Sequence, residues 1–206
     1  MPQVVLTADC WDLMVQAVLK VRERLLRATA ALDAAGVPYA VIGGNAVAAW
    51  VAQAGEGGVR NTVDVDLLLR RRDFEPARVA LEKAGFVYRH AAGIDLFLDG
   101  PGGKARDAVH IVVAGEKVRP DYPVPAPDVD ECVTDLPFAD EATTTPARRV
   151  LSLDALVRMK LTSFRDKDRT HLRDLAGVGT IDESWCERLP AELARRLREI
   201  LDNPDG

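Results

Sequence analysis

An apolar run that ends in two glycines constrains this chain more than any other feature. The segment VIGGNAVAAW, residues 41–50, joins a β-branched run to a helix-forming stretch through Gly43 and Gly44. Glycine permits a tight turn and a close approach of a ligand to the backbone. Because unpaired amides and the helix dipole favour an anion at a helix start, the turn is a candidate phosphate site. A simple packing turn is the alternative.

The next apolar run, TVDVDLLLR at residues 62–70, carries two aspartates. Side chains at i and i+2 of a strand point to the same face, so Asp64 and Asp66 are expected to lie together. Two close carboxylates repel each other unless a cation or hydrogen-bond donors lie between them. Mg²⁺ prefers such oxygens and keeps other positions for substrate phosphates. Solvated aspartates at a strand end are the simpler alternative.

The whole pattern predicts an α/β (α+β) fold: a mixed sheet with flanking helices and a helical C-terminal part. We expect an α/β domain over residues 1–150 and a helical segment over 151–206 that packs on it. Turn residues between two extended runs predict an antiparallel hairpin, and the proline-rich stretch 115–147 predicts an irregular crossing loop. The expected helices are 9–35, 45–54, 73–84, a helical region from Ser152 and 191–201, and the expected strands are 37–42, 62–69, 94–98 and 108–114.

Composition limits the classes of function. The net charge of −5 and the pI of about 5.3 give no global basic field of the kind that dominates non-specific nucleic-acid binding. The three cysteines, Cys10, Cys132 and Cys186, have no paired spacing, which favours reduced thiols over disulfides or structural zinc. No stretch has the length of a membrane span and the N-terminus lacks secretory features. We therefore expect a cytoplasmic protein.

The glycine turn and the acidic strand together resemble the nucleotidyltransferase superfamily, which includes DNA polymerase β and small bacterial antibiotic and toxin nucleotidyltransferases. The resemblance covers roughly residues 36–114. It implies that Gly43, Gly44 and Asn45 bind a nucleoside triphosphate and that Asp64 and Asp66 hold Mg²⁺ or Mn²⁺. The implied reaction is in-line attack of a hydroxyl on the α-phosphorus with release of pyrophosphate.

One position departs from the pattern of that family, which usually has a third acidic residue on a later strand. The corresponding run RDAVHIVVAG carries His110 there. Histidine prefers softer metals than Mg²⁺, so it replaces a carboxylate poorly as a Mg²⁺ ligand. Three interpretations stay open: His110 packs on the sheet, it acts as a base or beside the metal, or Asp95 stands in from the partner strand of the hairpin.

The C-terminal segment LVRMKLTSFRDKDRTHLRDL, residues 156–175, mixes cationic residues with aspartates. It resembles the helical segment of abortive-infection, type IV toxin-like nucleotidyltransferases, in which a lysine precedes an Arg-x-Lys-Asp cluster. On this resemblance Lys160, Arg165 and Lys167 contact the nucleotide or its partner, and removing the charge of Lys160 is predicted to weaken nucleotide binding without unfolding. A solvated helix with surface ion pairs is the alternative.

The function that these features favour is metal-dependent transfer of a nucleoside monophosphate to a hydroxyl of an RNA such as tRNA, a protein or a small molecule. The resemblance makes a toxin-like role with an antitoxin-like partner conceivable, and the acidic net charge favours a small-molecule acceptor over a large polyanion. The rival is a nucleotide-binding or regulatory protein that keeps the fold without turnover.

Overall fold

A computed structural model describes residues 8–55, 62–134 and 148–206. A mixed sheet of seven strands forms its centre, in the order β3-β4-β5-β2-β1-β7-β6. Two neighbouring pairs, β2 with β5 and β1 with β7, run parallel, and the other pairs are antiparallel. The strands are β1 (Ala40–Ile42), β2 (Val65–Leu69), β3 (Val87–Ala91), β4 (Ile94–Leu98), β5 (Val109–Val113), β6 (Cys132–Val133) and β7 (Val150–Leu151).

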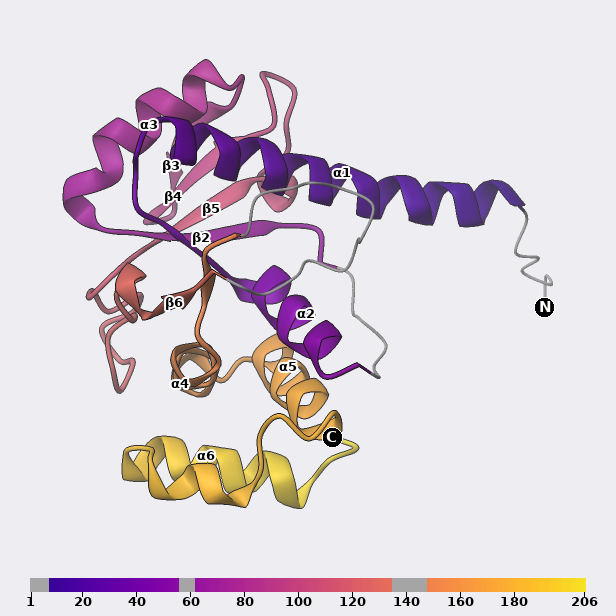
Figure 1. Cartoon of the computed structure of the whole chain (residues 1–206), viewed down its shortest axis with the longest axis vertical. Coiled ribbons are helices and arrows are strands. Elements are labelled where there is room, and N and C mark those ends of the chain that lie inside the picture. The colour runs from indigo at the N-terminus through magenta and orange to yellow at the C-terminus, as the bar shows by residue number, and fades with distance from the viewer. Residues whose placement is uncertain (1–7, 56–61, 135–147) are drawn as a thin grey trace.

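Helices lie on both sides of this sheet (Figure 1). Two of them, α1 and α3, contact each other above the sheet in that view, whereas α2, α4 and α5 lie below it and α6 packs against α4 and α5. The helices are α1 (Ala8–Ala34), α2 (Gly43–Gln53), α3 (Phe74–Lys83), α4 (Leu153–Ser163), α5 (Asp166–Gly177) and α6 (Ala191–Asp202). Short 3-10 turns cover Arg71–Asp73, Ala105–Asp107, Val129–Glu131 and Glu183–Glu187.

The buried residues form one apolar cluster that reaches from α1 through the sheet to α6. The central strand β2 contributes four fully buried positions because it has neighbours on both edges and helices on both faces. Residue 150, the predicted domain boundary, begins β7, which pairs with β1. Helices α4 and α5 pack against α2, so the C-terminal helices support the element that begins with the glycine pair.

The structure confirms the α/β fold class and most predicted elements. The two runs around residues 94–98 and 108–114 pair antiparallel, as predicted. Ser152 caps α4 by accepting a hydrogen bond from the amide of Ala155, and Phe164 breaks the C-terminal helical region with a left-handed backbone. The sequence patterns missed β3 and β7, and strand β2 begins at Val65, three residues later than predicted.

Two further expectations meet the structure in part. Cys132 and Cys186 are free thiols, and the side chain of Cys10 lies outside the described residues. Much of the predicted crossing loop, residues 135–147, also lies outside them, whereas its earlier part contains a 3-10 turn and β6. Within the described ranges, no helix has the length and apolar character that crossing a membrane requires.

Candidate active site

Three chain segments meet at one level of the sheet because of its strand register. Ile42, the last residue of β1, lies opposite Asp66 of β2, and Asp66 lies opposite His110 of β5. The chain turns into α2 at the residue after Ile42, so Gly43 is placed directly beside Asp66. Paired residues of adjacent strands project to the same face. The sheet thus brings the glycine turn, an aspartate and a histidine together.

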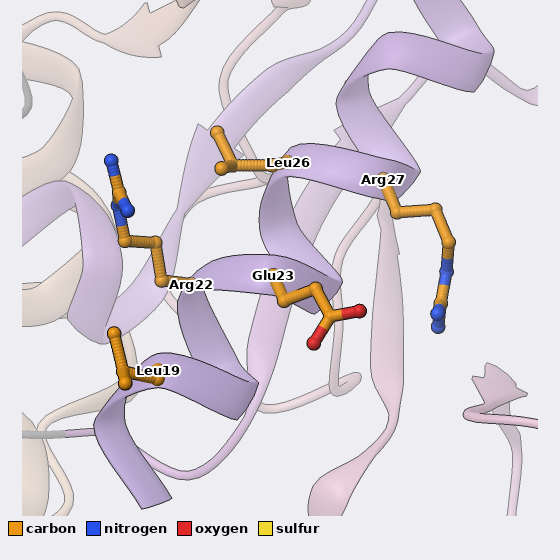
Figure 2. A pocket seen from close by; sticks show the side chains of 5 residues that line it. All are labelled: Leu19, Arg22, Glu23, Leu26 and Arg27. Carbon is orange, nitrogen blue, oxygen red and sulfur yellow. The ribbon is translucent and has the colours of Figure 1, made fainter. Parts of the chain in front are cut away.

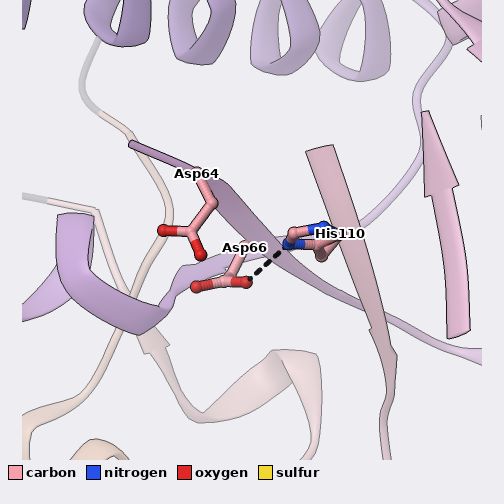
Figure 3. Close-up of side chains that lie close together, drawn as sticks. All are labelled: Asp64, Asp66 and His110. Atoms are coloured by element: carbon pink, nitrogen blue, oxygen red, sulfur yellow. Dashed lines mark ion pairs between the residues drawn. The ribbon is translucent and has the colours of Figure 1, made fainter. Parts of the chain in front are cut away.

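Asp64, Asp66 and His110 form a cluster on that face (Figure 3). One ligand atom of each residue lies within 4.8 Å of the ligand atoms of the other two, and all three side chains are partly buried. His110 Nδ1 lies 3.6 Å from Asp66 Oδ1. His110 Nε2 lies 3.0 Å from the carbonyl oxygen of Ala105, to which it donates when protonated. That hydrogen bond leaves Nδ1 of the neutral ring as an acceptor toward the carboxylates.

The carboxylate of Asp66 also affects the protonation of His110. Its contact with the ring, helped by the carbonyl of Ala105, raises the pKa of His110 above its ordinary value, although burial works against this shift. A divalent cation in the cluster would favour the neutral ring, since metal coordination uses the Nδ1 lone pair.

Asp64 precedes β2, and contacts from several segments hold it in place. Burial alone would raise the pKa of Asp64, but a 2.5 Å hydrogen bond from Thr62 and the nearby ammonium of Lys167 outweigh it, so that the pKa lies below its ordinary value. Asn45 Nδ2 donates to the carbonyl of Asp64 at 3.0 Å. Asp64 is therefore ionised at neutral pH and fixed to the first turn of α2.

Arg24 fixes the same segment from the α1 side of the sheet. Its guanidinium is buried, with Nη1 3.2 Å from the carbonyl oxygen of Val63 and Nε 3.1 Å from Oδ2 of Asp99. Arg27 pairs with the other oxygen of Asp99. These contacts tie α1, the loop after β4 and the approach to Asp64 together.

The neighbouring side chains leave no room for a Cβ atom at either glycine of the turn. Gly43 has a φ of +68°, and a Cβ built there would lie 1.9 Å from Oδ2 of Asp66. A Cβ on Gly44 would lie 2.9 Å from the side chain of Thr62. The residue before the helix, Ile42, has no side-chain acceptor for the first amides of α2. The helix start therefore presents amide donors next to the acidic cluster, which suits an anion.

Lys167, near the start of α5, completes the charge pattern. Its Nζ lies 3.2 and 3.5 Å from the two carboxylate oxygens of Asp64. About half of the Lys167 side chain is exposed, so the ammonium can leave Asp64 for another anion without unfolding the helix.

Comparison with solved structures decides the fold. No protein family model and no curated protein match the chain in sequence. An antigenic nucleotidyltransferase-like protein from Paracoccidioides brasiliensis is 19% identical in sequence, and its alignment covers 89% of this chain and 86% of that chain with a TM-score of 0.50. The chain has the nucleotidyltransferase fold.

The chain is also similar to the antibiotic-resistance factor ANT(2'')-Ia. Its solution structure is 16% identical with a TM-score of 0.47, and the alignment covers 93% of this chain and 92% of that chain. A crystal structure of ANT(2'')-Ia in complex with adenylyl-2''-tobramycin is 20% identical with a TM-score of 0.44, and covers 93% of this chain and 99% of that chain.

The acidic cluster of this nucleotidyltransferase fold suits a divalent metal ion. Two ligand atoms bonded to one ion at about 2.1 Å are at most about 4.2 Å apart, so atoms within 4.8 Å need only small side-chain rotations. Two carboxylates and one imidazole suit Mn²⁺ better than Mg²⁺, because nitrogen is a softer ligand than oxygen. The residues present therefore fit a metal.

Asp95 does not belong to this cluster, and the hypothesis that it stands in for the third carboxylate from the partner strand, almost opposite His110, is wrong. The register of the hairpin places Leu96 opposite His110, and Asp95 opposite Ile111. Alternation along β4 therefore sends the Asp95 carboxylate to the other face of the sheet. There it accepts a hydrogen bond from Tyr88 and pairs with His90.

The three predicted basic residues, Lys160, Arg165 and Lys167, differ in whether they contact the acidic cluster. Lys160 is buried, with Nζ 3.0 Å from Oδ1 of the fully buried Asp168, and the Arg165 side chain lies 2.8 Å from Oδ2 of the same carboxylate. Ser163 also donates to it. These contacts hold the turn between α4 and α5. Lys160 and Arg165 therefore support the turn that presents Lys167, and Lys167 alone of the three contacts the acidic cluster.

Sequence patterns did not identify Arg24 and Thr62 as residues of the site. Arg24 lies within a long amphipathic helix and reaches Val63 across 39 positions. No local pattern marks such a contact. Thr62 begins a predicted strand, and only its position two residues before Asp64 indicated that its hydroxyl could donate to that carboxylate.

Proposed function

We propose that this chain is a metal-dependent nucleotidyltransferase that moves a nucleoside monophosphate from a nucleoside triphosphate to a hydroxyl acceptor. One observation carries the proposal: Asp64, Asp66 and His110 converge beside a glycine turn that opens α2 and has no room for a side chain at Gly43. An anion-binding turn and a metal-binding cluster in contact are what triphosphate chemistry needs.

Each residue has a distinct task in this proposal. The first amides of α2, at Gly43 and Gly44, bind triphosphate oxygens. Asp64 and Asp66, with His110 Nδ1, hold Mn²⁺ or Mg²⁺, which when bound polarises the phosphoryl group and neutralises its charge. Lys167, which contacts Asp64, would donate to a phosphate oxygen instead if a bound metal balanced the charge of that aspartate. Asn45 keeps Asp64 against the glycine turn.

The acceptor is proposed to be a small molecule rather than an RNA. The net charge of −5 repels a large polyanion, whereas a small hydroxyl compound bears no such penalty. A toxin-like role stays a prediction from the resemblance of residues 156–175. The acceptor experiment below therefore includes tRNA and cell protein as well as small molecules.

A second function is favoured by two contacts of the acidic cluster. His110 replaces a third carboxylate, and Lys167 already neutralises Asp64. A protein that binds a nucleotide without transferring it would tolerate both features. Nucleotide binding without transfer is thus the alternative.

Label transfer distinguishes the two functions. The protein is incubated with each α-³²P-labelled nucleoside triphosphate, Mn²⁺ or Mg²⁺, and in turn total tRNA, cell protein and an aminoglycoside panel. Transfer in wild type and its loss in Asp66→Asn would support the enzyme. Asp95→Asn is the matched control, because it removes a carboxylate from the opposite face of the same sheet. Metal-dependent binding without transfer to any acceptor would favour the alternative.

A further inference from the structure

A hollow beside α1 belongs to the helix layer that the acidic cluster does not face. Residues of α1 line it (Figure 2): Leu19, Arg22, Glu23, Leu26 and Arg27. Asp66 lies beside the start of α2, on the other side of the sheet (Figure 1). A further residue that acts on the acidic cluster is therefore to be sought around α2, α4 and α5.

The turn between α4 and α5 has a strained backbone. Helix α4 ends at Ser163 and α5 begins at Asp166, so Phe164 and Arg165 form the link. Phe164 has a φ of +47° and a ψ of 31°, in the left-handed region. That region is unfavourable for a residue with a side chain, and helix ends commonly place glycine there. Because such a residue persists only where its surroundings fix it, the Phe164 side chain is expected to have a role that glycine cannot fill.

The Phe164 ring contacts guanidinium groups from two different helices. Cζ of Arg169, on α5, lies 4.3 Å from the ring centroid, and Cζ of Arg196, on α6, lies 5.2 Å from it. The attraction between a cation and an aromatic face favours both contacts. Arg169 Nε also donates to the carbonyl oxygen of Phe164 at 3.4 Å. The ring therefore joins α5 to α6 at the turn.

Arg196 also binds the end of α4. Its Nη1 donates to the carbonyl oxygens of Leu161 and Thr162, both at 2.8 Å, and its Nε donates to Glu192 at 3.0 Å. Carbonyls in the last turn of a helix lack partners within the helix, so a cation is favourable there. The Arg196 side chain is only 20% exposed. One side chain of α6 thus fixes both the end of α4 and the ring that follows it.

The two residues that follow Lys167 in the first turn of α5 are both anchored. Asp168 is fully buried against Lys160, and Arg169 contacts Phe164. The first turn of α5 cannot rotate without breaking one of these contacts. The Lys167 side chain itself is half exposed. The direction of its ammonium therefore depends on where the turn between α4 and α5 holds the start of α5.

We propose that Phe164 and Arg196 are positioning residues for Lys167: they hold the first turn of α5 in the direction that brings the Lys167 ammonium to the acidic cluster. The inference rests on the proposed function, in which Lys167 donates to a phosphate oxygen. Neither Phe164 nor Arg196 belongs to the acidic cluster, so both act through Lys167. A turn that served the fold alone would affect stability without separating metal binding from nucleotide binding.

Calorimetric titration of Arg196→Gln tests this role at a temperature where the variant is folded. The change removes the cation from the ring and from the end of α4. The affinity for a nucleoside triphosphate in saturating Mn²⁺ should fall several-fold, and the affinity for Mn²⁺ alone should not fall. Arg195→Gln is the matched control, because the described partners of Arg195, Glu192 and Glu199, both lie on α6. Equal affinities in the two variants would overturn the proposal.

Two further variants show whether the effect passes through Lys167 and the ring. In the Lys167→Ala background, Arg196→Gln should change nucleotide affinity by less than about twofold, because the group that it positions is gone. Additive losses would overturn the proposal. Phe164→Gly keeps the left-handed turn without strain but lacks the ring, so it should lose nucleotide affinity as Arg196→Gln does. Wild-type nucleotide affinity in Phe164→Gly would overturn the role of the ring.

Hydrogen exchange without ligands separates this inference from the proposed function. The amide of Arg169 donates to the carbonyl oxygen of Arg165 at 2.9 Å, in the first turn of α5. It should exchange several-fold faster in Arg196→Gln than in Arg195→Gln. Equal exchange rates would overturn the positioning role. A wild type that binds no nucleoside triphosphate would instead contradict the proposed function, and the exchange rates would then decide the role of the turn by themselves.

Discussion

Lys167 Nζ lies 3.2 Å from Oδ1 of Asp64, although 103 positions separate the two residues in the chain. The contact joins the N-terminal turn of α5 to the approach of β2, and so places the C-terminal helices at the acidic cluster. The ammonium is thus a cationic partner of the Asp64 carboxylate.

Replacing Lys167 with alanine should raise the affinity for metal and lower the affinity for nucleotide. Without the competing ammonium, Mn²⁺ alone should bind more tightly, by several-fold. The affinity for a nucleoside triphosphate in saturating Mn²⁺ should fall by roughly tenfold, because one charge-assisted hydrogen bond to phosphate is lost. Calorimetric titration measures both. Equal weakening of the two ligands would contradict the proposed exchange of partners.

Gly43→Ala should strain the backbone and, in addition, disrupt the acidic cluster. The positive φ alone costs a non-glycine residue about 1–2 kcal/mol, and here the new Cβ also displaces the Asp66 carboxylate. Gly85→Ala is the matched control, since its φ of +89° is comparable and its Cβ would meet no atom within 4 Å. Melting temperatures should fall in both variants, by about 2–8 °C in the control. Loss of Mn²⁺ binding should occur in Gly43→Ala only.

His110→Asp should change the preferred metal. The variant offers three carboxylates, which suit Mg²⁺ better than the wild-type set of two carboxylates and an imidazole. We expect the Mg²⁺ concentration at half-saturation to fall by roughly tenfold, while Mn²⁺ binding changes little. Unchanged Mg²⁺ affinity in this variant would place His110 outside the metal site.

The cluster could be predicted from the sequence because its signals are local. Two aspartates spaced i, i+2 share a face in any strand, and a glycine pair between a strand and a helix marks a tight turn whatever surrounds it. His110 could be placed by its position within an apolar run. The fold class followed from the alternation of helical and extended runs, which the sheet order confirms.

Other features depend on contacts that no local pattern encodes. Strand β7 has two residues, too few for alternation to appear, and it exists because its backbone pairs with β1 and β6. The error for Asp95 was one of register: shifting a strand by a single residue moves its side chain to the opposite face. Lys160 looked like a free cation because its buried partner, Asp168, lies on the next helix.

Arg24→Gln should weaken metal binding although Arg24 lies on the other side of the sheet. The change removes the contact with Asp99 and loosens the segment that holds Asp64. We expect Mn²⁺ affinity to fall several-fold, with partial recovery in Arg24→Lys, at a temperature where both variants are folded. Arg78→Gln, on the surface of α3, is the control. Unaltered Mn²⁺ affinity in a folded Arg24→Gln would show that Arg24 has no role in positioning Asp64.

His171 should make the protein sensitive to mild acid. Burial, with help from the charge of Lys160, lowers the pKa of His171 from 6.5 to about 4. Between these values the unfolded chain binds a proton that the folded chain does not, so stability falls by up to about 3 kcal/mol as the pH is lowered from 6.5 to 4. Urea unfolding at several pH values should show this slope in wild type.

His171→Leu should remove most of that slope. The comparison with the variant is needed because the raised pKa of His110 acts in the opposite sense, stabilising the fold at low pH and losing that contribution as the pH rises. An equal pH dependence in wild type and His171→Leu would contradict a neutral, buried His171.

The central claim is that metal and triphosphate meet where Asp64 and Asp66 face the glycine turn. Its most direct test is a calorimetric titration of a non-hydrolysable nucleoside triphosphate into the protein with and without Mn²⁺, in wild type and in Asp66→Asn. We predict binding that requires Mn²⁺ in wild type and is lost in Asp66→Asn while the melting temperature of the variant without ligands stays unchanged. Binding that is the same with and without Mn²⁺, or that Asp66→Asn retains, would contradict the account.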